Sequence, residues 1–241
     1  MPLQRYAYSR RVAATIHLQP TASLAERVLL PGDPGRALLL AQSLLAQPKM
    51  FNHNRGLWGY SGLAADGEPL TIQSTGMGGP SAAIVISELH ELGARTLLRV
   101  GTCGALDPAL DLGQLLVVSE AIAEDGTSRA LGAGPRVAPS PKLLARLREA
   151  AGEGSPSGAV VSTDLFYDGP AGAEEGWRTQ HALAVEMEAA TLFTLAARRG
   201  FEAGALLIVS DLVLPRRRIE LDHLHEAEHR LGEAAARALA R

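Results

Sequence analysis

The stretch that says most about the fold is Arg99-Val-Gly-Thr-Cys-Gly-Ala105. It follows the apolar run 96–100, so we interpret it as the place where a buried strand gives way to a turn. Two distant segments have the same character: Pro31-Gly-Asp-Pro-Gly-Arg36 and Val185-Glu-Met-Glu-Ala-Ala190. Because α/β folds gather their polar groups where strands end, we expect these three segments to form the functional site.

Elsewhere the chain alternates short apolar runs with longer amphipathic ones, which is typical of a mostly parallel sheet flanked by helices. The predicted fold class is therefore α/β, with a single-domain, mixed, largely parallel central sheet between helices. Strands are expected at 28–31, 70–74, 96–100, 115–119, 158–162, 182–185 and 205–210. Helices are expected at 35–46, 81–93 with Ser81 as its N-cap, 140–151, 187–199 and 221–241, and loops at 152–158 and 168–176.

The ends of the chain and its composition limit the class of protein. Residues 1–14 carry no periodic pattern and are interpreted as a flexible extension or a start-site artefact before one domain over 15–241. The net charge of -3 supplies no basic field for a nucleic acid. No run reaches the ~20 apolar residues of a membrane span, and no secretory signal is evident. With Cys103 as the only cysteine, no intrachain disulfide can form, and we expect a cytoplasmic protein.

The first segment with candidate chemistry is Gly32-Asp-Pro-Gly-Arg36. Its glycines let backbone amides approach a bound group, and Arg36 supplies a planar fork for an oxyanion. A plain surface turn is the competing interpretation. Arg99 lies inside a buried run, where a charge needs an anionic partner, either a bound anion or a structural carboxylate. Thr102 would add a hydroxyl to the same anion.

Acidic side chains end two other strands. Glu186 and Glu188 are spaced to point to one side of a strand end, where a carboxylate pair acts as general acid and base or one member accepts hydrogen bonds from a sugar diol. The competing interpretation has Glu186 solvated and Glu188 favouring a helix N-terminus. Asp211 comes at the end of the apolar run 206–209. We interpret it as a general acid, and the alternative is a helix cap or turn residue.

Over about residues 15 to 215 the chain resembles the nucleoside phosphorylase family, which includes trimeric and hexameric purine nucleoside and uridine phosphorylases. The motifs that carry the resemblance are Pro31-Gly-Asp-Pro-Gly-Arg36, Asn54-Arg-Gly56, Ser74-Thr-Gly-Met-Gly-Gly-Pro-Ser81, Arg99-Val-Gly-Thr-Cys-Gly-Ala105, Asp164-Leu-Phe-Tyr167, Val185-Glu-Met-Glu-Ala-Ala190 and Val209-Ser-Asp211. The resemblance implies a pentosyltransferase that cleaves an N-glycosidic bond reversibly with inorganic phosphate, giving a free base and (deoxy)ribose 1-phosphate without metal or organic cofactor.

Roles for single residues also follow from the resemblance. Phosphate would be held by Gly32, Arg36, Arg99 and Thr102, with Arg55 reaching into a neighbouring subunit's site. Ribose would be held by Met77, Met187 and Glu188, supported by Glu186, while His17 would approach the 5′-hydroxyl across a dimer interface and Phe166 would face the base. Asp211, in the Ser210-Asp211 pair, would donate a proton to purine N7. The implied assembly is a homo-hexamer, a trimer of dimers with shared sites.

The base is where the chain departs from each subgroup. Uridine phosphorylases carry a Gln and an Arg soon after the Phe-Tyr pair, and residues 166–172 contain neither. Bacterial purine enzymes carry the Ser-Asp pair and, further along the chain, an Arg that assists the Asp. In this chain the corresponding position falls near Leu224. Nearby Arg216, Arg217 or Arg218 would substitute, unless they form a solvated basic run. Purines are favoured, with uridine as the alternative.

Other functional classes have weaker support. His225-Glu-Ala-Glu-His229 satisfies the zinc protease pattern, but Ala235 stands where a third histidine would be needed, so we expect no metal. A nucleosidase would use water and have no need for two arginines at one anion. A non-catalytic nucleoside-binding protein is a third alternative, if Asp211 lacks its arginine. Gly-Met-Gly-Gly at 76–79 lacks the spacing of a dinucleotide site.

Overall fold

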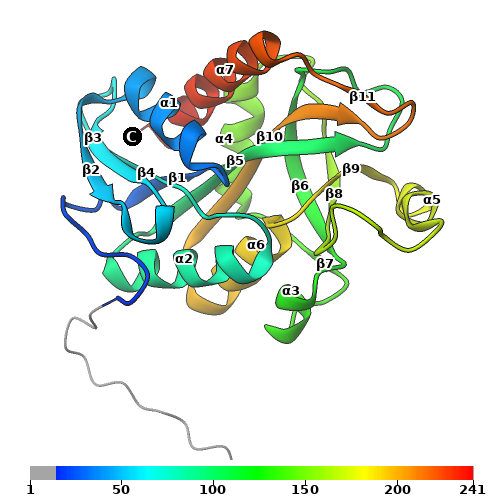
Figure 1. The fold of residues 1–241 in the computed structure, drawn as a ribbon, viewed down its shortest axis with the longest axis horizontal. Coiled ribbons are helices and arrows are strands. Elements are labelled where there is room, and N and C mark those ends of the chain that lie inside the picture. Colours follow the sequence, from blue (N-terminus) through cyan, green and yellow to red (C-terminus); the bar gives the residue numbers. More distant parts are fainter. Residues whose placement is uncertain (1–14, 241) are drawn as a thin grey trace, which may run out of the picture.

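A mixed β-sheet with helices on both faces forms the core of the computed structural model, which describes residues 15–240 (Figure 1). The predicted α/β class is confirmed. The expected N-terminal extension, residues 1–14, lies outside the described residues, as does Arg241. Among the described residues, no helix combines the length and the apolar character that a membrane span requires.

The sheet contains eleven strands in the described residues, in the order β11-β10-β6-β8-β9-β5-β1-β4-β3-β2, with β7 beside β6. The bounds are β1 Arg27–Leu30, β2 Ala46–Asn52, β3 Gly59–Leu63, β4 Pro69–Gln73, β5 Thr96–Ala105, β6 Leu115–Ala123, β7 Arg136–Val137, β8 Ser157–Ser162, β9 Ala182–Glu186, β10 Glu202–Leu212 and β11 Arg217–Arg218. Because β10 pairs with both β5 and β6, and β5 also pairs with β9, the five strands β5, β10, β6, β8 and β9 close into a ring.

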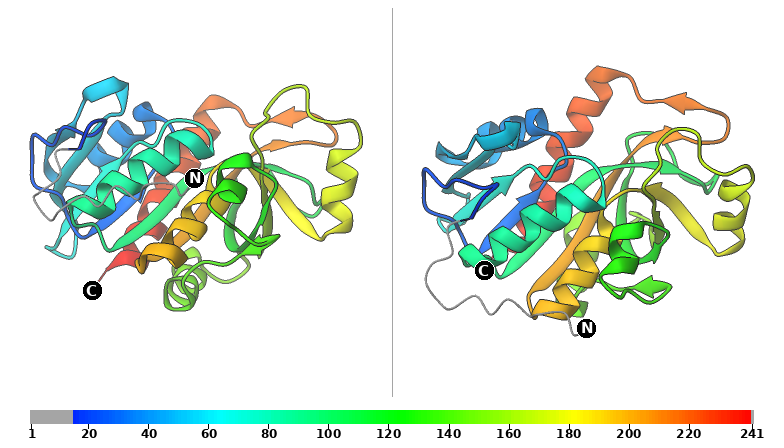
Figure 2. Two further views of the ribbon diagram at one scale, coloured as in Figure 1. Left: turned by 90° about the horizontal axis from the view of Figure 1, so that it is seen from below. Right: turned by 60° about the horizontal axis from the view of Figure 1, so that its bottom comes forward.

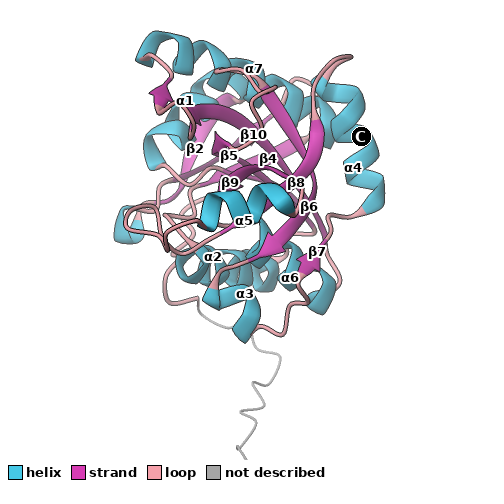
Figure 3. Ribbon diagram, turned by 90° about the vertical axis from the view of Figure 1, so that its right-hand side faces the viewer, coloured by secondary structure: helices cyan, strands magenta, loops and turns pink. Residues whose placement is uncertain are grey.

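Helices pack on the two faces of this sheet and bury two apolar layers. The bounds are α1 Pro34–Leu44, α2 Gly79–Leu92, α3 Gly126–Ala130, α4 Pro141–Ala151, α5 Ala173–Thr179, α6 Ala189–Arg199 and α7 Leu221–Leu239, with a short 3-10 turn at Asn54–Gly56. One layer lies under α2 and α6, and the other under α1, α4 and α7. Figure 3 shows the strands between these two groups of helices. The hairpin of β10 and β11 and the helix α5 lie at one end of the molecule (Figure 2).

The strand at 96–100 does not end at Gly101 as predicted. β5 continues to Ala105 because β10 pairs with it in parallel, residue by residue, from Thr96 to Ala105, with one bulge between Val209 and Asp211. A side chain at Gly101 would lie 2.8 Å from the Arg99 guanidinium, so the glycine makes room for that group within the strand. Gly101 therefore marks a place of close packing within the strand and not a turn.

Several element boundaries also differ from the prediction. Ser81 is not the cap of α2, which begins at Gly79 after Gly78 at a φ of 82°, and the Ser81 hydroxyl instead donates to the Thr75 carbonyl. Part of the expected loop 168–176 forms α5. The hairpin of β2 and β3 was not predicted, because most of β2 is exposed and lacks an apolar pattern.

Candidate active site

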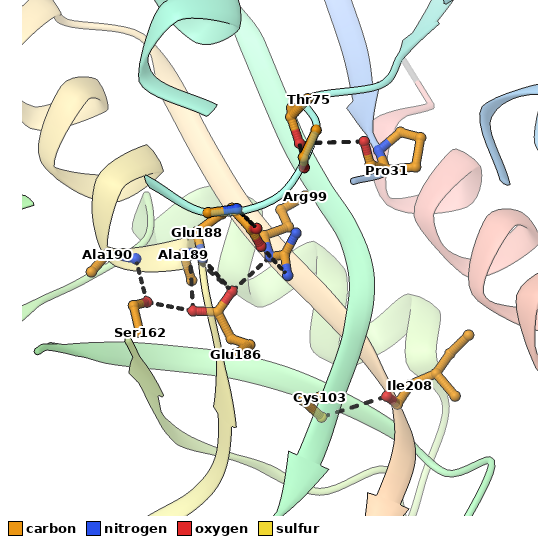
Figure 4. A network of polar contacts seen from close by, with 12 residues as sticks. Pro31, Thr75, Arg99, Cys103, Ser162, Glu186, Glu188, Ala189, Ala190 and Ile208 are labelled. Atoms are coloured by element: carbon orange, nitrogen blue, oxygen red, sulfur yellow. Dashed lines mark hydrogen bonds and ion pairs between the residues drawn. The ribbon is translucent and has the colours of Figure 1, made fainter. Parts of the chain in front are cut away.

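Arg99 of β5 is the centre of a buried polar cluster (Figure 4). Its Nε is 2.8 Å from Oε2 of Glu186, and its Nη2 is 2.6 Å from Oε2 of Glu188. Burial alone would lower the pKa of Arg99, but the charges of Glu188 and Glu186 outweigh it and the pKa is raised. Of the two partners expected for Arg99, a bound anion or a structural carboxylate, the structure contains the carboxylates of Glu186 and Glu188.

Glu186 ends β9 and fixes the start of α6. Its carboxylate accepts hydrogen bonds from the backbone N–H groups of Glu188 at 2.9 Å and Ala189 at 3.0 Å, and from the Ser162 hydroxyl. Ser162 in turn accepts from Ala190 N–H at 2.9 Å. Because these donors occupy Glu186 and it is only 4 % exposed, the solvated interpretation was wrong. The helix begins at Ala189 rather than at the predicted 187.

Glu188 connects Arg99 to the turn after β4. Its second carboxylate oxygen accepts from the backbone N–H of Gly78, next to the exposed Met77. A side chain added at Gly78 would come within 3.9 Å of the end of Met187, so the two methionines lie close to the same turn. Burial raises the pKa of Glu188, Arg99 opposes the rise and Glu186 adds to it. The structure thus brings Met77, Met187, Glu186 and Glu188 into one region.

The turn that carries Arg36 lies beside this cluster. Leu30 pairs with Arg99 across β1 and β5, and Gly32 accepts a 3.0 Å hydrogen bond from Gly76 of the neighbouring turn. Asp33 caps α1 by accepting from the N–H groups of Gly35 and Arg36. Arg36 itself is buried, so the segment is more than a surface turn. Its Nε is 2.7 Å from Oε1 of Glu228 in α7.

Asp211 lies near the end of β10, where the Ser210 hydroxyl donates to its Oδ2 at 2.7 Å. The strand β11 places Arg218 opposite Asp211, with its Nε 3.4 Å from Oδ1. Arg216 and Arg217 are exposed and form no ion pair with the described residues. Leu224 occupies the position at which the bacterial purine enzymes carry their assisting arginine, and it is in α7. One of the three arginines is therefore next to Asp211, as the sequence left open.

The other predicted site residues form no hydrogen bond or ion pair with Arg99. His17 is held to Glu88 of α2 by a 2.7 Å contact through Nδ1, and Asn54 donates to the His17 carbonyl, so His17 and Arg55 belong to one surface region. Phe166 is 66 % exposed and packs edge-on against Tyr167. Thr102 is half-buried on β5, and its hydroxyl forms no hydrogen bond with residues 15–240.

Comparison with known proteins is consistent with this geometry. A family model described as the phosphorylase superfamily matches residues 26–241. The chain belongs to the phosphorylase superfamily. It is similar to a DeoD-type purine nucleoside phosphorylase of Geobacillus kaustophilus, at 38% identity over 80% of this chain and 84% of the relative. A DeoD-type enzyme of Jannaschia sp. is 39% identical over 83% and 88%, and a guanosine phosphorylase of Halorubrum lacusprofundi is 39% identical over 76% and 77%.

Three residues of this superfamily member were missed in the sequence. Glu228 lies in the stretch from His225 to His229, for which the sequence predicts no function, yet it is 5 % exposed. It falls three residues before the buried Leu231 and seven before the buried Ala235, so helical periodicity places it on the apolar face. Ser162 and Glu88 carry no comparable signal. Within residues 15–240 no cluster of three or more acidic, His or Cys side chains is arranged to hold a metal.

Proposed function

We propose that the protein is a purine nucleoside phosphorylase, which transfers the pentose of a (deoxy)ribonucleoside from the base to inorganic phosphate. The observation that carries the proposal is the connection between Arg99 and Glu188, because it joins a buried cation to a carboxylate at the turn of Met77. A cation suited to phosphate and an acceptor suited to a ribose diol are thereby held side by side. The relatives named as purine nucleoside phosphorylases support the same activity.

Phosphate is proposed to bind between the turn of Gly32 and Arg36 and the terminal nitrogens of Arg99, near Thr102. Arg36 and Arg99 belong to adjacent parts of the fold, since Leu30 pairs with Arg99 just before the turn begins. Each arginine is held by carboxylates at its Nε and keeps a terminal nitrogen with no hydrogen bond or ion pair to the described residues. Guanidinium groups held in this way bind an oxyanion without reorganising.

Ribose is proposed to lie above this anion, with its hydroxyls on Glu188 and its apolar face against Met77 and Met187. Glu186 supports the arrangement without touching substrate, because its oxygens are occupied by Arg99, Ser162 and the start of α6. A phosphate oxygen then forms the new bond to C1′ while the bond from C1′ to the base nitrogen breaks and its electron pair goes to the base. The anion stabilises the oxocarbenium-like transition state.

The leaving base is proposed to take a proton at N7 from the carboxyl group of Asp211. Ser210 orients this group by donating to its other oxygen, and Arg218 stabilises the carboxylate that remains after the proton leaves. Phe166 is proposed to stack on the base. The close approach of Arg218 to Asp211 favours a catalytic protein over one that only binds nucleosides.

A shared site in a cytoplasmic homo-hexamer is proposed for the assembly, with nucleoside and phosphate as substrates and no cofactor. His17 and Arg55 lie in one region of the surface and form no described contact with the Arg99 cluster. They are proposed to complete the site of a neighbouring subunit.

The experiment that tests the function is release of free base from inosine, adenosine, guanosine and uridine, each with and without inorganic phosphate. We expect phosphate-dependent cleavage of the purines. Phosphate-dependent cleavage of uridine alone would assign the base pocket to uracil, cleavage without phosphate would make the protein a nucleosidase, and absence of cleavage would leave a binding protein.

A further inference from the structure

Glu228 of α7 forms a buried ion pair with Arg36. Oε1 is 2.7 Å from Arg36 Nε, and the two side chains are 7% and 9% exposed. This is the only hydrogen bond or ion pair that the Arg36 side chain forms with residues 15–240. The terminal nitrogens of Arg36, which carry four N–H donors, are therefore without a partner in this part of the chain.

The contact is held in place by close packing of α7 on α1. A side chain at Gly232, one turn after Glu228, would lie 2.5 Å from Leu40 and 3.2 Å from Leu44, both in α1. Because the two helices approach this closely, Glu228 and Arg36 have little freedom to separate. Glu228 therefore restricts the direction of the Arg36 guanidinium as well as balancing its charge.

Arg99 shows the same arrangement. Glu186 occupies its Nε at 2.8 Å, as Glu228 occupies that of Arg36. In both cases a buried carboxylate takes the inner edge of a guanidinium group and leaves terminal N–H groups for another ligand. A planar fork fixed at one edge loses little conformational freedom when it binds an oxyanion at the other.

We propose that Glu228 is a positioning residue for phosphate, which acts by directing Arg36 and so makes the C-terminal helix part of the anion site. The proposal rests on the proposed function for the identity of the anion. Two effects of Glu228 oppose each other, because its carboxylate orients Arg36 but also repels a phosphate dianion. We take orientation as the larger effect, because the buried contact restricts the Arg36 guanidinium.

The test compares Glu228→Ala, Glu228→Asp and Glu228→Gln by titration calorimetry with inorganic phosphate and by separate KM values for phosphate and inosine. We expect Glu228→Ala to weaken phosphate binding about tenfold, as for one lost charge-assisted hydrogen bond, with the KM for inosine unchanged. Glu228→Asp keeps the charge but draws the carboxylate back by one methylene group, so it should also weaken phosphate binding. Glu228→Gln keeps an acceptor for Nε and removes the repelling charge, so its affinity should equal or exceed that of the wild type.

Two controls separate positioning from loss of stability. Asp66→Ala removes the ion pair between Asp66 and Arg27, whose guanidinium also donates to the carbonyl of Leu239 at the end of α7. It should lower Tm without changing phosphate affinity. In an Arg36→Ala background, Glu228→Ala should have no further effect on phosphate binding.

Several outcomes would overturn the proposal. Unchanged phosphate affinity in Glu228→Ala and Glu228→Asp would do so, as would tighter binding in all three variants or equal losses for phosphate and inosine. If the wild type performs phosphorolysis and the Glu228 series is unaffected, only this inference fails. If the wild type neither binds phosphate nor depends on it, the proposed function fails as well.

Discussion

Arg218 of β11 lies directly opposite Asp211 of β10, and its Nε is 3.4 Å from the Asp211 carboxylate. The antiparallel pairing of two short strand ends creates this contact. The contact places a cation next to the acid that is proposed to protonate the base. The position at which the bacterial purine enzymes carry their arginine is occupied here by Leu224, in α7.

Arg218→Ala should lower kcat for inosine about tenfold and leave the KM for phosphate unchanged, because it removes the charge proposed to stabilise the Asp211 carboxylate after the proton has left. Arg217→Ala is the matched control, since Arg217 is exposed, adjacent and without an ion pair to the described residues. Steady-state kinetics of both variants check the prediction. Equal losses in the two would show that only the general positive charge of the hairpin matters.

Asp211→Asn should slow purine cleavage by ~100-fold or more, the usual range for a lost general acid. Calorimetry should show phosphate binding intact, because Asp211 forms no described contact with Arg36 or Arg99. Unchanged turnover of inosine would remove Asp211 from the mechanism.

Gly101→Ala should lower activity about tenfold or more without deleting any functional group, because the new methyl group would push on the Arg99 guanidinium 2.8 Å away. Arg99 cannot yield freely, since Glu186 and Glu188 hold it in a buried site. Gly176→Ala in α5 is the control, because nothing lies within 4 Å of its added methyl group. Wild-type kinetics in Gly101→Ala would contradict the assigned position of Arg99.

Glu188→Gln should raise the KM for inosine about tenfold and change the pH dependence of Tm. Burial raises the pKa of Glu188, so its contribution to stability is fully present below about pH 4.5 and is lost as the pH rises through the raised pKa. Glutamine does not titrate. The Tm of the variant relative to wild type should therefore increase from about pH 4 to about pH 7, and a difference that is constant or decreasing would refute the raised pKa.

Glu88→Ala should raise the KM for nucleoside several-fold with little change for phosphate, because Glu88 holds the segment that carries His17. Its carboxylate accepts from the N–H groups of Ile16, His17 and Leu18 and contacts the His17 ring. Glu91→Ala, on the same helix with an exposed ion pair to Arg199, is the control.

The same prediction has a consequence for assembly. If His17 completes a neighbouring subunit's site, dilution to a proven monomer should also reduce activity. A fully active monomer would exclude that role.

Local sequence patterns predicted a large part of the fold. The apolar runs that became β1, β4, β8 and β10 and the amphipathic runs that became α1, α2, α4 and α7 were located to within a few residues, because burial of one face imposes a period that remains visible in the sequence. The hairpin of β2 and β3 escaped prediction, since its exposed residues carry no such period.

The amino-acid sequence by itself determined the α/β class and the membership of the phosphorylase superfamily. Only the tertiary structure decided which charges pair. Arg99 with Glu186 and Glu188, Arg36 with Glu228, and Asp211 with Arg218 join residues from different elements. Periodicity reports which side of an element faces the core, whereas the partner of a buried charge depends on which elements the folded sheet and its helices bring into contact.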